Sequence, residues 1–337
     1  MSTLFCISSR SLREARACAR DRTHARTQGK GRSIPSHTRT TLHLQEYGRF
    51  FTGWYGHQLL AHADRLMHVA DRALRSRYPH LAFGMKCAGV HWWHGMESRP
   101  AEVTAGYCPI PLQRAEDLLG RGEADDDGSE DADAGDADAP ASMEQRRVPF
   151  YTALARLFQQ HRIKLAFTCV EMAATDHPPE FACAPEALLR EVRVAAALEG
   201  VGLLGENALE VYGRGAFNRP ALDRMLGASR QITVPLHELV RARTSRNTMI
   251  GAPEDEASGS FIPVLNADGD AVLPPLAGLT FLRLSVEMMK SDYADPWQTF
   301  VRDMSNPARA GQAVANNSQV SSLTEESKPA EAEASHA

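Results

Sequence analysis

The sequence predicts an α/β fold with a parallel sheet. Short apolar runs, long enough for buried strands, alternate four times with segments in which apolar residues recur every three or four positions. This alternation is typical of parallel strands joined by crossover helices. A polar side chain lies at or just after the end of each run, where parallel-sheet enzymes place their chemistry. We therefore expect the functional site at the carboxyl edge of the sheet.

Size and composition are those of an ordinary globular protein. The chain has 337 residues, of which 43% are hydrophobic and 23% charged, and its formal net charge is -5. The acidic balance argues against general nucleic-acid binding. The absence of an eighteen-residue apolar run argues against a membrane span. None of the six cysteines forms a CxxC pair, so we expect buried free thiols in a reducing compartment.

The folded domain is predicted over residues 46–305, flanked by a leader and a tail and interrupted by one insertion. Residues 1–45 form a basic leader rich in Arg, Ser and Thr, which fits an organelle transit peptide or an unstructured tail. Residues 110–147 contain the acidic block ADDDGSEDADAGDADA and are predicted to be a disordered insertion. The Ala/Glu/Ser-rich tail, residues 306–337, is also expected to be disordered.

The first helix and strand are predicted over residues 50–77 and 81–91. The helix is amphipathic, and Pro79 ends it. The strand carries Lys86, which is costly to bury unless it is paired or lines a site. His91 ends this strand. With His94 it has a spacing that allows metal binding, but no third ligand is near in sequence, so we expect no metal.

The next two strands are predicted over residues 163–170 and 201–204, after helices over 150–161 and 184–198. The first of these strands carries Thr168. The second leads into Gly205-Glu206-Asn207. Trp92 and Trp93, after the first strand, suit either stacking on sugar rings or core packing.

The last strand is predicted over residues 279–284 and carries Arg283. A short helix over 218–228 precedes it, with Pro220 in the first turn. Residues 243–275 are expected to form a loop because they are rich in Gly, Pro, Ser and acids. A final helix is predicted to begin near Trp297.

The polar residues at the four strand ends are His91, Thr168, Glu206 and Arg283. This is the arrangement of the active-site face of a TIM barrel. A closed barrel needs eight βα units, and this chain supplies about four. We therefore expect half a barrel, whose open sheet edges could support self-association.

Glu206 is the best placed carboxylate. It could act as a general base, although a surface or helix-capping role is the simpler explanation of a glutamate after a strand. Hydrolysis of a glycosidic bond uses two carboxylates on opposite faces of the sugar. Glu171 is the next candidate, with Glu102 after it, and a structural role explains each of them more simply.

Several segments, in order along the chain, resemble the C-terminal half of the β-amylase family. They are LAFGMKCAGVHWWHGMES with AEVTAGY, IKLAFTCVEM, GLLGENALEVY and GLTFLRLS. YGRFFTGWYGHQLLAHADRL, from Tyr47, resembles the family's segment just before these. The resemblance runs from Tyr47 to Met304, interrupted by the acidic block and by residues 251–275.

The resemblance implies part of a (β/α)8 barrel that removes maltose from the non-reducing ends of α-1,4-glucans such as starch and maltodextrin, with inversion. It implies that Glu206 is the general base. It also implies a set of substrate-binding residues: Lys86, His91, Thr168, Asn207, Ala208 and Arg283. No cofactor, nucleic acid or membrane partner is implied. A starch substrate agrees with a plastid location, and the cytoplasm is the alternative.

The sequence departs from the family most clearly at the general acid. The family's acid lies in a GELRYPSYP-like segment on an earlier strand, and the 337 residues contain no such segment. Because inversion needs both carboxyls, we expect little or no activity from this chain alone. Two hypotheses follow. One is a β-amylase whose chain is incomplete here; the other is a non-catalytic glucan-binding or regulatory half barrel that acts through self-association.

Overall fold

The computed structural model describes most of the predicted domain and little outside it. The described residues are 4–6, 46–88, 106–119, 147–179, 183–207, 219–251, 261–282, 284, 286 and 290–306. Structural statements below refer to these residues. The predictions of disorder for the acidic block and for the C-terminal tail concern residues outside them.

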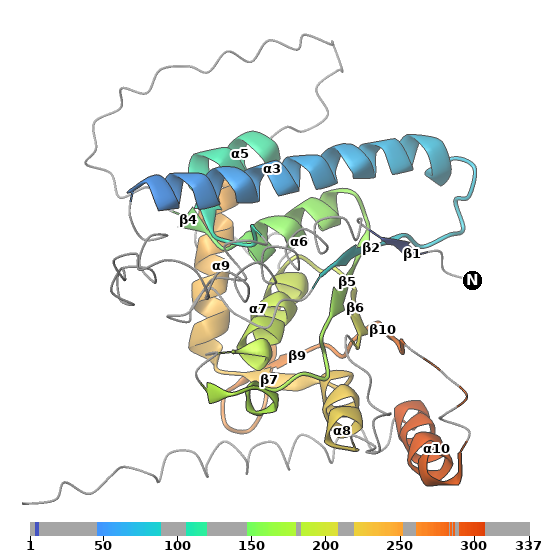
Figure 1. Cartoon of the computed structure of the whole chain (residues 1–337). Coiled ribbons are helices and arrows are strands. Elements are labelled where there is room, and N and C mark those ends of the chain that lie inside the picture. Colours follow the sequence, from blue (N-terminus) through green and yellow to red (C-terminus); the bar gives the residue numbers. More distant parts are fainter. Residues whose placement is uncertain are drawn as a thin grey trace, which may run out of the picture.

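The centre of the fold is a five-stranded parallel sheet (Figure 1). Its strands, in spatial order, are β1 (Leu4–Cys6), β2 (Gly84–Cys87), β5 (Lys164–Thr168), β6 (Leu203–Glu206) and β10 (Gly278–Thr280). Each strand pairs with the strand of this sheet that precedes it in the chain, as in an open piece of a (β/α) barrel. The predicted α/β half barrel is therefore confirmed. β1 is an addition, because it lies inside the predicted leader.

The main helices around these strands were also predicted, although the last of them begins at Ser291 and not near Trp297. They are α3 (Glu46–Ala70), continued by the π-helical turn η2 (Asp71–Arg75), α6 (Phe150–Gln160), α7 (Pro185–Leu198), α8 (Arg219–Ala228) and α10 (Ser291–Ser305). α3 runs over α6, and α8 lies beside α10 at the far end of the sheet (Figure 1). None of the described helices is both long and apolar enough to cross a membrane.

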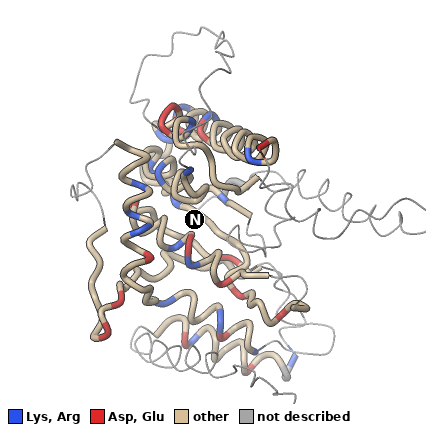
Figure 2. The backbone as a smooth tube through the Cα atoms, turned by 90° about the vertical axis from the view of Figure 1, so that its left-hand side faces the viewer, with Lys and Arg blue, Asp and Glu red and all other residues tan. Residues whose placement is uncertain are grey.

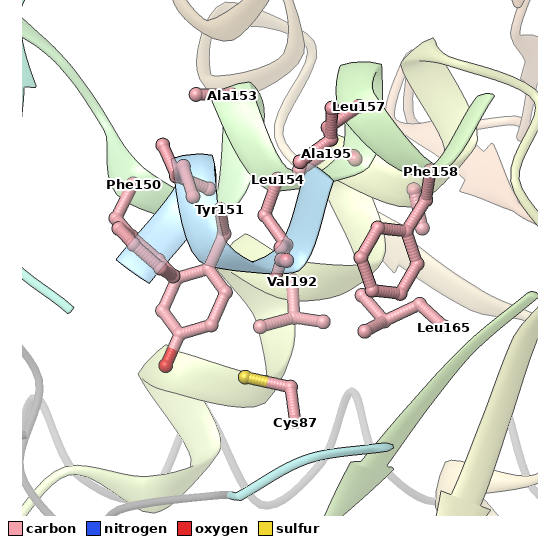
Figure 3. Close-up of a cluster of buried hydrophobic side chains, with 14 of the residues drawn as sticks. Cys87, Phe150, Tyr151, Ala153, Leu154, Leu157, Phe158, Leu165, Val192 and Ala195 are labelled. Atoms are coloured by element: carbon pink, nitrogen blue, oxygen red, sulfur yellow. The ribbon is translucent and has the colours of Figure 1, made fainter. Parts of the chain in front are cut away.

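The main core lies between α6, α7 and the strands β2 and β5. Figure 3 shows Leu154 and Phe158 of α6 and Val192 of α7 directed toward Cys87 and Leu165 of the sheet. All five side chains are less than a tenth exposed. Cys87, Cys108, Cys169 and Cys183 are buried thiols outside any disulfide of the described residues, as predicted for these positions.

The predicted boundary of the acidic insertion at residue 110 is wrong. Residues 110–119 form β3 (Ile110–Pro111) and α5 (Leu112–Leu119), and β3 pairs antiparallel with β4 (Arg147–Val148). Ile110 and Ala115 are fully buried in the main core. The apolar side chains of this segment belong to the domain, and the acidic composition of the following residues hid them.

The loop predicted over residues 243–275 is also wrong. α9 (Leu236–Ile250) occupies its beginning, and β8 (Val264–Leu265) and β9 (Ala271–Leu273) join β7 (Ile232–Val234) in a three-stranded antiparallel sheet. Most of α9 is polar, so its sequence lacks a clear apolar stripe. Its C-cap Gly251, at φ 64°, adopts the left-handed conformation that ends many helices.

A buried ion-pair cluster joins three of the helices. Glu199, at the C-cap of α7, accepts a hydrogen bond of 2.7 Å from Nε of Arg246 in α9, and its other oxygen lies 3.4 Å from Nη1 of Arg156 in α6. The side chains of Glu199 and Arg246 are only 1% and 3% exposed. Charges this deeply buried are tolerated only when they are paired, so the cluster fixes the end of α7 against α6 and α9.

Arg193 of α7 ties the small antiparallel sheet to α8 through backbone carbonyls. Its guanidinium donates to the carbonyl oxygens of Ala228, Arg230 and Pro274 at 2.6–2.7 Å. Burial lowers the pKa of Arg193 to about 10, which is still high enough for the guanidinium to be cationic at neutral pH.

Over the described chain, basic and acidic residues are interspersed along the helices (Figure 2).

Candidate active site

The carboxyl edge of the sheet brings together four of the predicted site residues. Lys86 lies on β2, Thr168 ends β5, Glu206 ends β6, and Asn207 follows it directly. Thr168 and Glu206 are partners in the β5–β6 register. Lys86 pairs with Ala166, two residues before Thr168, so its side chain extends past β5 to reach Glu206.

Lys86 and Glu206 form an ion pair through Nζ and Oε1. The Glu206 side chain is 7% exposed, whereas that of Lys86 is 24% exposed. A buried carboxylate is stable only beside a compensating charge. The pair explains why a lysine is tolerated in an apolar strand, and it places a paired carboxylate at the tip of β6.

Gly205 allows β6 to approach its neighbours closely. A Cβ atom added there would lie 2.5 Å from Leu276 Cδ1 and 3.1 Å from Leu279 Cδ1. The first distance is impossible without movement, so the glycine of the GEN sequence has a packing reason. Glu206 is also the last residue of the strand, two residues beyond the predicted end of that strand.

Asn207 holds the chain at the end of β10. Its Oδ1 accepts a hydrogen bond of 2.6 Å from the Leu282 N–H, and its Nδ2 donates to the Leu282 carbonyl at 3.4 Å. Asn207 is fully buried. Asn207 therefore positions the backbone of Leu282, the residue before Arg283. The sugar contact of Asn207 remains a prediction.

Cys169, which sequence reasoning passed over, turns the chain beside the site. Its φ of 68° is uncommon for a residue with a side chain, and such backbone strain often accompanies functional sites. Its Sγ lies 3.5 Å from Thr168 Oγ1, and the next residue, Val170, donates its N–H to the Glu206 carbonyl at 3.3 Å. Burial raises the pKa of Cys169 to about 12, so its thiol stays protonated at neutral pH.

Glu171, the second candidate carboxylate, is 2% exposed. Arg224 of α8 donates to its backbone carbonyl at 2.5 Å and to the Asp176 carboxylate at 2.7 Å. Arg224 was also missed, because its partners lie far away in the sequence. These contacts anchor the loop that follows Thr168 against α8.

Other predicted site residues lie outside the described part of the chain. They are His91, Ala208 and Arg283, together with the candidates Trp92, Trp93, His94 and Glu102. Their proposed contacts therefore stay predictions.

The described residues supply a carboxylate, a neighbouring ammonium group, a hydroxyl and a backbone-anchored amide at one edge of the sheet. This combination can deprotonate a water molecule and hydrogen-bond a polyhydroxylated ligand.

Comparison with known proteins gives a consistent result. A chloroplastic beta-amylase 2 of Oryza sativa subsp. japonica is 33% identical over 166 residues, which are 49% of this chain and 23% of the relative. Beta-amylase Tri a 17 of Triticum aestivum is 28% identical over 262 residues, which are 78% of this chain and 37% of the relative. The chain thus spans well under half the length of these two relatives.

Among solved structures, the catalytic domain of beta-amylase from Paenibacillus polymyxa aligns with a TM-score of 0.42 and 16% identity, covering 88% of this chain and 54% of that one. The sequence profile of glycosyl hydrolase family 14 matches residues 32–115 and 132–246. These two ranges make up more than half of the chain and include Lys86, Thr168, Glu206 and Asn207. The chain therefore belongs to glycosyl hydrolase family 14.

Proposed function

We propose that the chain carries the general-base side of a β-amylase-type site that hydrolyses α-1,4-glucosidic bonds in starch-like glucans and releases maltose. The Lys86–Glu206 pair at the tip of β6 carries this proposal. Membership of family 14 and the names of the relatives support it. Thr168 and Asn207, with His91, Ala208 and Arg283, contact or position the glucan.

In the proposed reaction, Glu206 takes a proton from a water molecule that attacks the anomeric carbon. The bond to the glycosidic oxygen breaks as the new bond forms on the opposite face, which inverts the configuration. The leaving oxygen must receive a proton from a second carboxyl group. Since the sequence holds no GELRYP-like segment, we propose that this chain alone hydrolyses starch poorly.

A substrate with a better leaving group tests the base independently of the acid. Fluoride leaves α-maltosyl fluoride without protonation, so that substrate does not need the missing carboxyl group. We expect the purified chain to release fluoride from it, and Glu206→Gln to lower that rate by roughly 10²- to 10⁴-fold, the usual contribution of acid–base catalysis. With soluble starch, maltose release should stay near background.

Two results would contradict this assignment in different ways. In the first, Glu206→Gln leaves fluoride release unchanged, while soluble starch still retards the chain in a native gel. That result would favour the non-catalytic glucan-binding alternative. That alternative draws on β1 and β10, which have a neighbouring strand on one side only within the described sheet. Size-exclusion chromatography would then show self-association. If the chain neither released fluoride nor was retarded by starch, both proposals would be rejected.

We further propose a plastid location. The first 45 residues are rich in Arg, Ser and Thr and poor in acids, a composition typical of transit peptides. Two of the Oryza sativa relatives are named as chloroplastic. A fluorescent protein fused behind residues 1–60 should enter plastids in plastid-bearing cells, and a fusion that lacks residues 2–45 should not. Diffuse cytoplasmic fluorescence of both fusions would contradict the proposal.

A further inference from the structure

A second cluster of polar side chains lies at the opposite end of β5 from Glu206. His161, the C-cap of α6, precedes β5, whereas Thr168 ends that strand beside Glu206. Asp64 and His68, one turn apart on α3, face His161 across the helix contact. The cluster is thus separate from the proposed glucan site.

The three side chains converge closely. Asp64 Oδ1 lies 2.8 Å from His161 Nε2 and 3.5 Å from His68 Nε2. One potential ligand atom from each residue lies within 4.8 Å of the other two. A tetrahedral zinc ion with bonds of about 2.0–2.1 Å separates its ligand atoms by about 3.3 Å. The two measured separations, 2.8 and 3.5 Å, lie on either side of that value.

We propose that Asp64, His68 and His161 bind a divalent transition metal ion, with Zn²⁺ as the best match, which links α3 to the end of α6. Two imidazoles and one carboxylate form a donor set that zinc prefers. The His68 side chain is 63% exposed, so an ion can reach the cluster from solvent, and a water molecule can complete its coordination.

A second carboxylate lies near the other side of the His161 ring. The other ring nitrogen of His161, Nδ1, lies 4.0 Å from Asp71 Oδ2. Asp71 is fixed by Arg75, whose Nε donates to its Oδ1 at 2.5 Å, and Arg75 also donates to the His161 carbonyl at 2.7 Å. Metal-binding histidines usually donate their free N–H to such a carboxylate, which sets the tautomer. At 4.0 Å Asp71 is too far to accept that hydrogen bond here, and in the proposed site it is the carboxylate that would accept it.

Metal titration of the full-length chain, after removal of metal with EDTA, tests the proposal without reference to activity. We expect one Zn²⁺ per chain by calorimetry and one Co²⁺ with the visible absorption of a four- or five-coordinate ion. His68→Ala and Asp64→Asn should each weaken binding by at least about tenfold, since loss of an outer partner alone costs about 10- to 100-fold. Zn²⁺ should also raise the Tm of the unsubstituted chain but not that of His68→Ala.

His62→Ala is the matched control, because His62 is an exposed histidine on the same helix and outside the cluster. It should bind Zn²⁺ as the unsubstituted chain does. His68 is exposed, so its replacement should leave the fold intact. Unchanged Zn²⁺ affinity in both His68→Ala and Asp64→Asn, or an equal loss in His62→Ala, would overturn the site.

Discussion

Glu199→Ala is expected to destabilise the domain by about 3–5 kcal/mol, the usual cost of removing one partner from a buried ion pair. The substitution leaves the Arg246 guanidinium, whose side chain is 3% exposed, without the carboxylate that lies 2.7 Å from its Nε. It also removes a contact of Arg156. Domains are commonly stable by only about 5–15 kcal/mol, so this change should strongly reduce the urea midpoint measured by circular dichroism.

The control for this experiment is Asp223→Ala. It breaks the ion pair of Arg219 and Asp223 on α8, whose side chains are 46% and 53% exposed. Exposed pairs of this spacing contribute only about 0.3–0.5 kcal/mol. If Glu199→Ala shifted the urea midpoint no further than Asp223→Ala, the buried cluster would not hold the three helices together.

Lys86→Met is expected to be nearly as damaging, because it leaves the Glu206 carboxylate, 7% exposed, without its ammonium partner. Loss of about 3–5 kcal/mol is typical when a buried charge becomes unpaired. Methionine keeps most of the volume and the unbranched shape of the lysine side chain, so packing changes little. The free energy of unfolding from urea titration measures the effect.

The double substitution Lys86→Met with Glu206→Gln separates pairing from packing. When both charges are removed, no charge is left unpaired, so most of the stability should return while Glu206-dependent fluoride release stays absent. Residues in one ion pair usually show coupling energies of about 0.5–3 kcal/mol. A double variant whose destabilisation equals the sum of the single ones would show that the two side chains act independently.

The strands and main helices could be predicted because parallel strands are buried on both faces and read as continuous apolar runs. β5, around Phe167, and β6, around Leu203, are of this kind. α9 could not be predicted in the same way. Only four of its fifteen residues are buried, Leu239, Arg246, Asn247 and Met249, and two of these are polar. Its sequence therefore resembles that of a loop.

The sequence predicted which residues lie at the candidate site, but it did not predict which side chains contact one another there. Strand ends and the family resemblance selected Lys86, Thr168, Glu206 and Asn207, whereas the Lys86–Glu206 pairing depends on β2 and β6 lying on either side of β5. Glu199 and Arg246 are 47 residues apart, and no local sequence pattern around either residue indicates that they pair. The positive φ of Cys169 could not be predicted either, because cysteine has no preference for that conformation.

The chain-ordered sheet also bears on how the protein is made. Within the described part, each strand of the large sheet pairs with the strand of that sheet that precedes it in the chain. A ribosome delivers the chain from its N-terminus at about 5–20 residues per second. Each newly released strand can therefore dock on a neighbour that has already emerged. Synthesis and assembly of this sheet can therefore proceed in the same direction.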